Sequence, residues 1–225
     1  MPLAAEYLID HYPSRGAKLA DGWVHGIGIA AALAGGGVML SLSLGAHGGG
    51  GLTAATAIYA VCLIAMLAFS AAYNLTHAHS ARPVLRKLDE AGIFLMIAGS
   101  YTPFTTQRFE GVWGSGMTTL VWGVALAGVA GKLFTRRVPE WAWTLVYVAF
   151  GWLAVLAIKP LVSGVPMTTL VLLVLGGLIY TSGALVFHSR LAYRRAIWHG
   201  FVVAAAGVHY AAICIGVVLA APLGA

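Results

Sequence analysis

Long apolar runs alternate with short polar segments along almost the whole chain. Each run is close to the ~20 residues that an α-helix needs to cross the hydrocarbon core of a bilayer. The pattern predicts seven membrane-spanning helices, which occupy residues 22–44, 52–75, 88–106, 117–134, 141–158, 168–187 and 196–221. The predicted fold class is therefore all-α: a polytopic membrane protein built as a seven-transmembrane-helix bundle.

The segments between these helices are too short to hold a second domain. Residues 1–21 contain acidic residues, a proline and no long apolar run, and they lack the basic segment and apolar core of a cleaved signal peptide. We expect a short cytoplasmic tail at 1–21 and a single transmembrane domain at 22–225. Glycine recurs within the predicted helices, and small residues allow helices to approach closely in a membrane.

Composition and charge add a topology to this picture. The chain is 60% hydrophobic and 9% charged, which excludes a soluble globular protein. Its net charge of +6 comes from residues dispersed among the loops, so we expect no nucleic-acid partner. Eleven of the 13 basic residues lie on the cytoplasmic side if the N-terminus is cytoplasmic, and only Arg108 and Lys159 lie outside. The positive-inside rule therefore predicts a multi-pass protein of the inner (cell) membrane with its C-terminus outside.

Polar residues of the predicted helices gather at the predicted cytoplasmic end of the bundle. They are Asp21, His25, Ser70, Asn74, His77, His79, Asp89, Glu90, His188, Arg195 and His199. Polar groups at membrane depth are costly, and they often mark functional sites. Helical spacing places Ser70, Asn74 and His77 on one face of the second helix. The same spacing places Arg195 and His199 on one face of the last helix.

Several motifs occur in an order that is typical of a known family. They are "HGIG" at 25–28, "SAAYN" at 70–74, "LDEAGIFLMIAGSYTPF" at 88–104, "GW" at 151–152, "GGLIYTSGALVF" at 176–187 and "RRAIWHGFVVAAAGVHY" at 194–210. On these motifs the chain resembles the haemolysin III branch of the progestin and adipoQ receptor family, over nearly its whole length. The resemblance implies a seven-helix bundle with a cytoplasmic N-terminus.

The resemblance also implies a zinc site at the cytoplasmic end. In the family, one ligand is a histidine four residues after a serine on the second helix, and two more come from an H-x-x-x-H on the last helix. An aspartate of the third helix stands near the metal-bound water. Such a site suits hydrolysis of a lipid amide such as a ceramide.

Three positions of this chain match that pattern and two do not. Ser70 matches the serine, Asp89 the aspartate and His199 the second histidine of the last helix. The remaining ligand positions hold Asn74 and Arg195. An amide is a poor zinc ligand, and a guanidinium cannot be deprotonated in a protein.

Two interpretations of this departure stay open. In the first, the metal is lost and Arg195 supplies the missing positive charge to Asp89 or Glu90. In the second, the metal has moved to His77, His199 and Asp89 or Glu90, with His79 and His25 as further candidates. We favour loss, because a ligand one turn further along the helix lies about 5 Å away. An Arg195 that only reaches toward the lipid headgroups is the structural alternative.

The sequence thus predicts an altered-site, receptor-like or regulatory membrane protein that acts in membrane homeostasis. The alternative is a zinc-dependent lipid amide hydrolase of the ceramidase type, with Asp89 as base, Ser70 as a positioning residue and His199 as a ligand. Expected partners are membrane lipid and a lipid or fatty-acid ligand inside the bundle, and a homo-oligomer stays open. We interpret the deeper His209 as structural. A retinal pump is excluded, because residues 196–225 contain no lysine.

Overall fold

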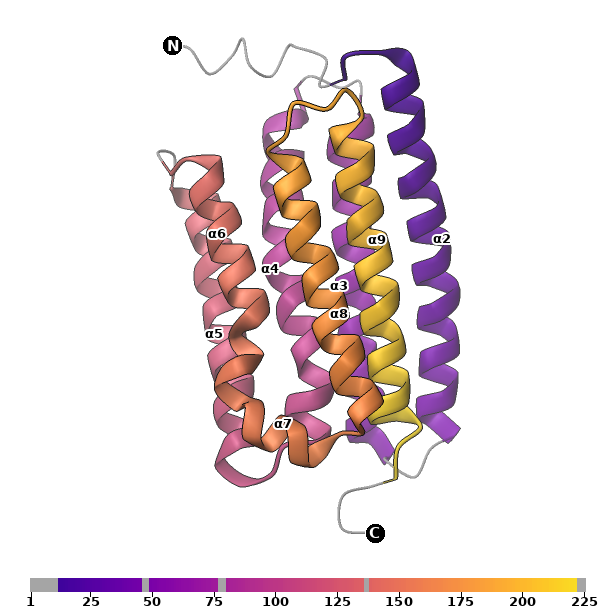
Figure 1. Ribbon diagram of the computed structural model, residues 1–225, viewed down its shortest axis with the longest axis vertical. Coiled ribbons are helices and arrows are strands. Elements are labelled where there is room, and N and C mark those ends of the chain that lie inside the picture. Colours follow the sequence, from indigo (N-terminus) through magenta and orange to yellow (C-terminus); the bar gives the residue numbers. More distant parts are fainter. Residues whose placement is uncertain (1–11, 46–48, 77–79, 136–137, 222–225) are drawn as a thin grey trace.

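The protein is an antiparallel bundle of long helices. A computed structural model describes residues 12–45, 49–76, 80–135 and 138–221, and within these ranges it contains helices and no strand. The long helices run side by side along the longest axis of the molecule (Figure 1). They are α2 (Arg15–Gly45), α3 (Gly49–Leu75), α4 (Arg82–Gln107), α5 (Gly111–Phe134), α6 (Glu140–Gly151), α8 (Met167–Phe187) and α9 (Arg194–Ile213). The predicted all-α fold class is confirmed.

Six helical segments of the described residues are long and apolar enough to cross a membrane. They are α2, α3, α5, the segment Glu140–Gly164, α8 and the segment Arg194–Val218. Helix α4 does not meet the same measure of composition, because its first turns carry several charged residues and its last turns are rich in threonine. It packs against α3 and α5 within the bundle. The seventh span and the direction of insertion therefore remain predictions.

Helix α2 begins at Arg15, so residues 15–21 of the predicted tail belong to the first helix. The Oγ of Ser14 accepts a hydrogen bond of 3.1 Å from the backbone N–H of Ala17, which is the usual way in which serine starts a helix. The buried positions of α2 then recur every three or four residues and include Asp21 and His25. The early start thus carries Asp21 into the bundle.

The segment 141–158, predicted as one helix, is broken in the structure. Helix α6 ends at Gly151, a 3-10 helix η1 (Trp152–Ala157) follows, and α7 (Ile158–Gly164) leads to α8. The hydroxyl of Tyr101 on α4 donates to the carbonyl oxygen of Gly151 at 2.8 Å and accepts from the N–H of Ala154 at 2.8 Å. A side chain inserted into the backbone ladder is a known cause of such breaks.

Helices α8 and α9 lie in close contact along much of their length. A Cβ atom on Gly176 of α8 would lie 2.2 Å from Cδ2 of His209 on α9, so only glycine allows this approach. The Nε2 of His209 lies 3.2 Å from the carbonyl oxygen of Leu173 on α8, which agrees with the structural interpretation of this histidine. After α9 the chain continues as a π-helical turn, η2 (Cys214–Val218).

Candidate functional site

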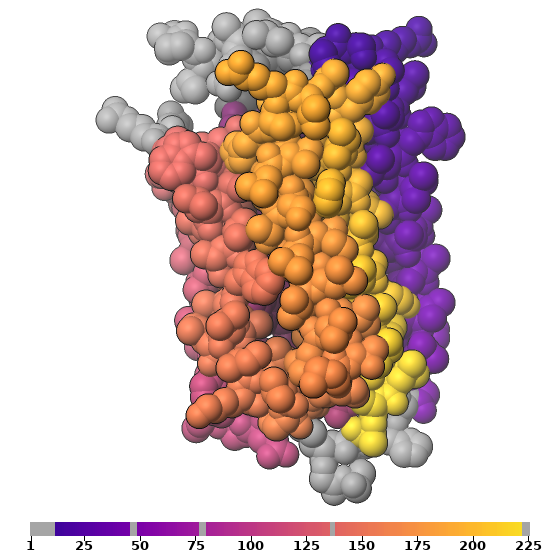
Figure 2. Space-filling view, viewed as in Figure 1, coloured from indigo at the N-terminus to yellow at the C-terminus, as the bar shows by residue number. Residues whose placement is uncertain are grey.

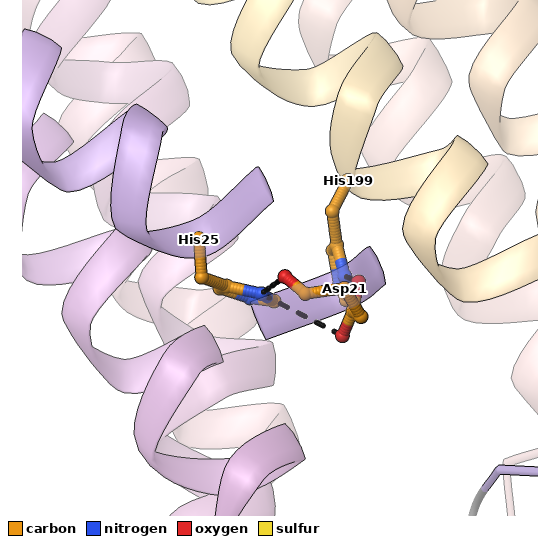
Figure 3. A group of neighbouring side chains, drawn as sticks. All are labelled: Asp21, His25 and His199. Atoms are coloured by element: carbon orange, nitrogen blue, oxygen red, sulfur yellow. Dashed lines mark hydrogen bonds and ion pairs between the residues drawn. The ribbon is translucent and has the colours of Figure 1, made fainter. Parts of the chain in front are cut away.

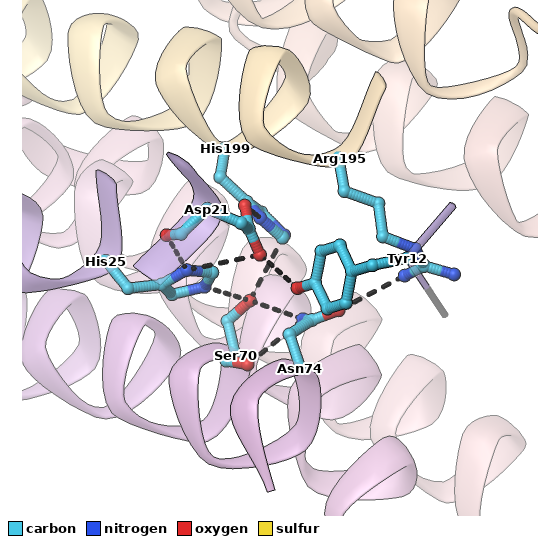
Figure 4. Close-up of polar contacts among 7 residues, drawn as sticks. All are labelled: Tyr12, Asp21, His25, Ser70, Asn74, Arg195 and His199. Carbon is cyan, nitrogen blue, oxygen red and sulfur yellow. Dashed lines mark hydrogen bonds and ion pairs between the residues drawn. The ribbon is translucent and has the colours of Figure 1, made fainter. Parts of the chain in front are cut away.

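A polar cluster lies at the end of the bundle where α2, α4, α6 and α9 begin, which we call the Asp21 end. Figure 4 shows its seven residues, which come from the segment before α2 and from α2, α3 and α9: Tyr12, Asp21, His25, Ser70, Asn74, Arg195 and His199. Each of the three helices contributes two residues four positions apart, and these share a helix face. The spacing that the sequence shows on α3 and α9 therefore places these side chains together.

Asp21 holds both histidines of the cluster (Figure 3). Its carboxylate is 0% exposed, and Oδ1 lies 2.6 Å from Nδ1 of His199. The backbone oxygen of Asp21 lies 2.9 Å from Nδ1 of His25. The other carboxylate oxygen accepts a short hydrogen bond from the hydroxyl of Tyr12.

These contacts fix the tautomers of the two rings. A carbonyl oxygen and a carboxylate oxygen only accept hydrogen bonds, so the Nδ1 atoms of His25 and His199 carry the hydrogens. In the neutral rings the Nε2 atoms then present lone pairs, and both point at Ser70 (Figure 4). The Oγ of Ser70 lies 3.2 Å from Nε2 of His25 and 3.4 Å from Nε2 of His199. Asp89 of α4 lies next to Ser70.

The two positions that depart from the family pattern are bonded to each other. Nη1 of Arg195 donates to Oδ1 of Asn74 at 3.1 Å. Nδ2 of Asn74 donates to the backbone oxygen of Ser70 at 3.0 Å and contacts its Oγ at 3.4 Å. Nε of Arg195 is buried and has no hydrogen-bond partner in the part of the chain that the structure describes.

The side chains at the family's ligand positions, Asn74 and Arg195, do not fit the zinc ion that the resemblance implies. A guanidinium has no lone pair to offer a metal, and the amide oxygen of Asn74 already accepts from it. Asp21, His25 and His199 do bring three atoms that can ligate a metal within 4.8 Å of one another. The Nδ1 atoms of these histidines are held by Asp21, so only their Nε2 atoms could ligate a metal, and both Nε2 atoms lie against Oγ of Ser70.

The other predicted site residues are distributed differently. The carboxylate of Glu90 forms its ion pairs with cations other than Arg195. It pairs with Nε of Arg86 at 2.9 Å and with Nζ of Lys132 at 3.0 Å. The structure thus shows Arg195 hydrogen-bonded to Asn74, whereas the charge of Glu90 is balanced by two other cations. His77 and His79 lie outside the described residues.

From the sequence, His25 is a further candidate for the shifted metal site, and Asp21 is one of the polar residues of this end without an assigned role. Their signal was an aspartate and a histidine one turn apart at the polar end of a helix. Tyr12 was missed, because nothing in the sequence ties that segment to the bundle. Asp21 and His199 are 178 positions apart, so only the fold shows that they are partners.

A cavity of about 370 Å³ extends from the polar cluster between the helices. Ser70, Asn74, Asp89, Arg195 and His199 line its polar end. Its other walls are mainly apolar side chains, among them Met66, Ile93, Met96, Phe104, Leu161, Leu173 and Val202. The residues line a space with one polar end and a long apolar part, which is the shape of an amphipathic ligand.

The cavity also reaches the side of the bundle. Val155 of η1 and Val174 of α8 line it, and they are 59% and 50% exposed. Figure 2 shows this face, with a hollow between the α6–η1 segment and α8. The opening therefore lies in the region that lipid surrounds, if these helices span the membrane as their composition indicates.

Comparison with known proteins places this architecture in a family. A family model described as "Haemolysin-III related" matches residues 17–210. "Hemolysin-3" of Bacillus cereus is 32% identical over 186 residues, which cover 82% of this chain and 84% of that protein. "Hemolysin-3 homolog" of Bacillus subtilis (strain 168) is 29% identical over 187 residues, which cover 82% and 87%. The human "Monocyte to macrophage differentiation factor" is 28% identical over 163 residues, which cover 69% and 67%. The chain therefore belongs to the haemolysin III family, within the progestin and adipoQ receptor superfamily.

Proposed function

We propose that this protein is an altered-site haemolysin III member that binds a single-chain lipid in its cavity and acts as a receptor-like regulator of membrane homeostasis. The observation that carries the proposal is the cavity itself, which joins a charged, hydrogen-bonding end to an apolar interior. A volume of about 370 Å³ is near the low end for ligand pockets, and it suits one acyl chain rather than two.

The polar end suits a lipid headgroup that carries oxygen atoms. Arg195 brings a positive charge, and its buried Nε–H is a donor without an acceptor among the described residues. Placing such a donor away from water costs free energy until a ligand accepts from it. A carboxylate or carbonyl oxygen at this point would supply the missing acceptor.

The topology belongs to the same proposal. We propose that α4 is the seventh span, that the Asp21 end faces the cytoplasm, and that the protein lies in the inner (cell) membrane. The support is the charge distribution: Arg82, Arg86, Lys87, Lys132 and Arg194 lie near the Asp21 end, whereas Arg108 and Lys159 lie near the other. A homo-oligomer remains compatible with this arrangement.

Lipid binding is tested by filling the cavity from one helix. Leu173→Trp places an indole in the cavity, whereas Leu178→Trp on the same helix points away, because Leu178 is 52% exposed and is not among the lining residues. Both proteins are purified in a mild detergent, and single-chain lipid that copurifies is measured by mass spectrometry. We expect near-stoichiometric lipid in the wild type and in Leu178→Trp, and strong loss in Leu173→Trp. Wild-type protein free of lipid, also after incubation with fatty acid or lysolipid, would sink the proposal.

The zinc-dependent lipid amide hydrolase with Asp89 and His199 remains the alternative. The group of Asp21, His25 and His199 favours it, since three metal-ligating side chains lie close together. Elemental analysis of protein purified without chelator separates the two functions. About one equivalent of zinc in the wild type, lost in His199→Ala, supports the hydrolase. A content below a tenth of an equivalent supports the altered site.

A further inference from the structure

Ser70 lies where a histidine, a carboxylate and the cavity meet. We propose that Ser70, His199 and Asp21 form a metal-free nucleophilic site that cleaves a carboxylic ester of the acyl chain held in the cavity. This inference rests on the proposed lipid binding for its substrate and goes beyond it in assigning a reaction.

The three side chains are connected in the order that serine catalysis needs. Asp21 is fully buried, and its Oδ1 accepts from Nδ1 of His199 at 2.6 Å. The opposite nitrogen of the ring, Nε2, lies 3.4 Å from Oγ of Ser70. A nucleophile next to a base that a third group orients is the general signature of this chemistry on unrelated folds. The contact of 3.4 Å is long, but such contacts tighten when substrate binds.

Ser70 has one proton and more than one acceptor around it. Nε2 of His25 lies 3.2 Å from Oγ, and the carboxylate of Asp89 lies near the same hydroxyl. We assign the proton to His199, because its Nδ1 lies 2.6 Å from a carboxylate oxygen of Asp21 and that of His25 lies 3.5 Å away, so the His199 ring gains most when it becomes charged. The lone pair of His25 is then left to hold the hydrogen of a water molecule beside Ser70.

N–H donors of Asn74 and Arg195 line the cavity together with Ser70. Nδ2 of Asn74 is 3.4 Å from Oγ of Ser70, and Arg195 is bonded to Asn74 through Nη1 while its Nε–H is unpaired among the described residues. Donors fixed in advance beside a nucleophile stabilise the oxyanion that forms when it attacks a carbonyl. The two residues that remove the family's metal ligands thus provide the positive charge and the N–H groups that an ester carbonyl requires.

The reaction balances with water as the only co-reactant. Oγ of Ser70 bonds to the carbonyl carbon, its proton passes to Nε2 of His199, and the carbon–oxygen bond to the alcohol breaks as that proton moves to the alcohol oxygen. Water then attacks the acyl-serine and gives a proton to His199. The carbon–oxygen bond to Ser70 breaks, the serine recovers its proton, and the carboxylic acid leaves.

A long-chain alkyl fluorophosphonate tests the nucleophile directly, since it bonds to an activated serine and releases fluoride. The full-length protein is labelled in lipid nanodiscs, and the modified residue is identified by mass spectrometry of peptides. We expect labelling at Ser70, none in Ser70→Ala, and a rate at least about 10-fold lower in Asp21→Asn and His199→Gln. Treatment with phenanthroline should leave the rate unchanged.

Ser100→Ala is the matched control, because Ser100 lines the same cavity but donates to the carbonyl oxygen of Ile97. Its labelling should equal that of the wild type. Each variant is first shown to be monodisperse and to unfold at a temperature close to the wild type's. If Asp21→Asn does not fold, His199→Gln decides. Absence of labelling in folded wild type, labelling that phenanthroline abolishes, or labelling lost in Asp89→Asn but kept in Asp21→Asn would each overturn the triad.

The two proposals fail separately. If the wild type carries lipid but does not react with the fluorophosphonate, the proposed nucleophile is contradicted and the proposed lipid binding is supported. If the wild type reacts at Ser70 but takes up neither fatty acid nor lysolipid, the proposed nucleophile is supported and the proposed lipid binding is contradicted.

Discussion

Asn74 and Arg195 are the residues that set this protein apart from the family pattern, and the structure shows that they act as a pair. The hydrogen bond of 3.1 Å joins α3 to α9 where the resemblance implies that a metal joins them. A hydrogen bond between two side chains thus connects the helices at the position where the family's metal would connect them. The pair also explains how both positions can depart from the family pattern together, since neither Asn74 nor Arg195 could form this hydrogen bond without the other.

Restoring the two histidines should restore metal binding. The double variant Asn74→His/Arg195→His, together with His199, offers three imidazoles on facing helices, which is a complete three-ligand zinc site. We expect about one zinc per chain after equilibration with zinc and gel filtration, measured by elemental analysis. Each single variant should hold much less, because Arg195 or Asn74 still occupies one ligand position.

The control for this experiment adds His199→Ala to the double variant, which removes the third ligand. Zinc retained at one equivalent in that triple variant would mean that the metal binds elsewhere. A double variant that is folded and binds no zinc would show that the geometry of α3 and α9 has also diverged.

The sequence predicts the local part of the site better than its assembly. Ser70 with Asn74 and Arg195 with His199 lie on common faces, as a spacing of four residues requires. The pairing of Asp21 with His199 depends on how α2 and α9 pack, and hydropathy carries no information about that contact. The site therefore could be located at one end of the bundle from sequence, but its central carboxylate could not be chosen.

At the scale of elements, the positions of the helices follow from apolar runs, whereas their interruptions do not. Residues 141–158 are apolar throughout apart from a few small or polar positions, so the sequence favours one helix. The break after Gly151 depends on the hydroxyl of Tyr101, which comes from another helix. A tertiary contact thus overrides a local pattern.

The contact of α8 with α9 depends on Gly176. Gly176→Ala should destabilise the protein strongly, because the added Cβ would lie 2.2 Å from the ring of His209 and one of the helices must move. Small-to-large changes in tight packing typically cost about 1–3 kcal/mol. Thermal unfolding in detergent can be followed with a thiol-reactive dye that reports the exposure of the free cysteines Cys62 and Cys214.

Gly123→Ala is the control on α5, where an added Cβ has no atom within 4 Å. Its melting temperature should stay level or rise, since alanine favours a helix over glycine by about 1 kcal/mol. Equal losses in the two variants would contradict the special role of Gly176.

At the scale of the whole molecule, the bundle has two unlike ends. The polar cluster and most of the basic residues lie at the Asp21 end, and α7 with the turn between α4 and α5 closes the other. At that second end Arg108 is 5% exposed, and its Nη1 donates to the carbonyl oxygen of Ala221 at 2.7 Å. The end opposite the site is therefore fastened by a buried cation.

The orientation of these ends can be measured with two single cysteines. In a protein whose Cys62 and Cys214 are replaced by alanine, Ser163→Cys places a thiol at the Arg108 end, and Ala192→Cys places one at the Asp21 end. Both native side chains are exposed. A membrane-impermeant maleimide should label Ser163→Cys in intact cells and Ala192→Cys only after the membrane is opened. The reverse result would invert the proposed topology.

The opening beside Val155 and Val174 changes how any affinity of this protein should be expressed. A ligand that enters between helices arrives from the bilayer, where it is already partitioned, so its concentration in water is not the relevant quantity. Occupancy would then follow the mole fraction of the lipid in the membrane. When the amount of ligand is held fixed and the total amount of lipid is raised, the mole fraction of ligand in the membrane falls. The fraction of protein that binds ligand should fall with it.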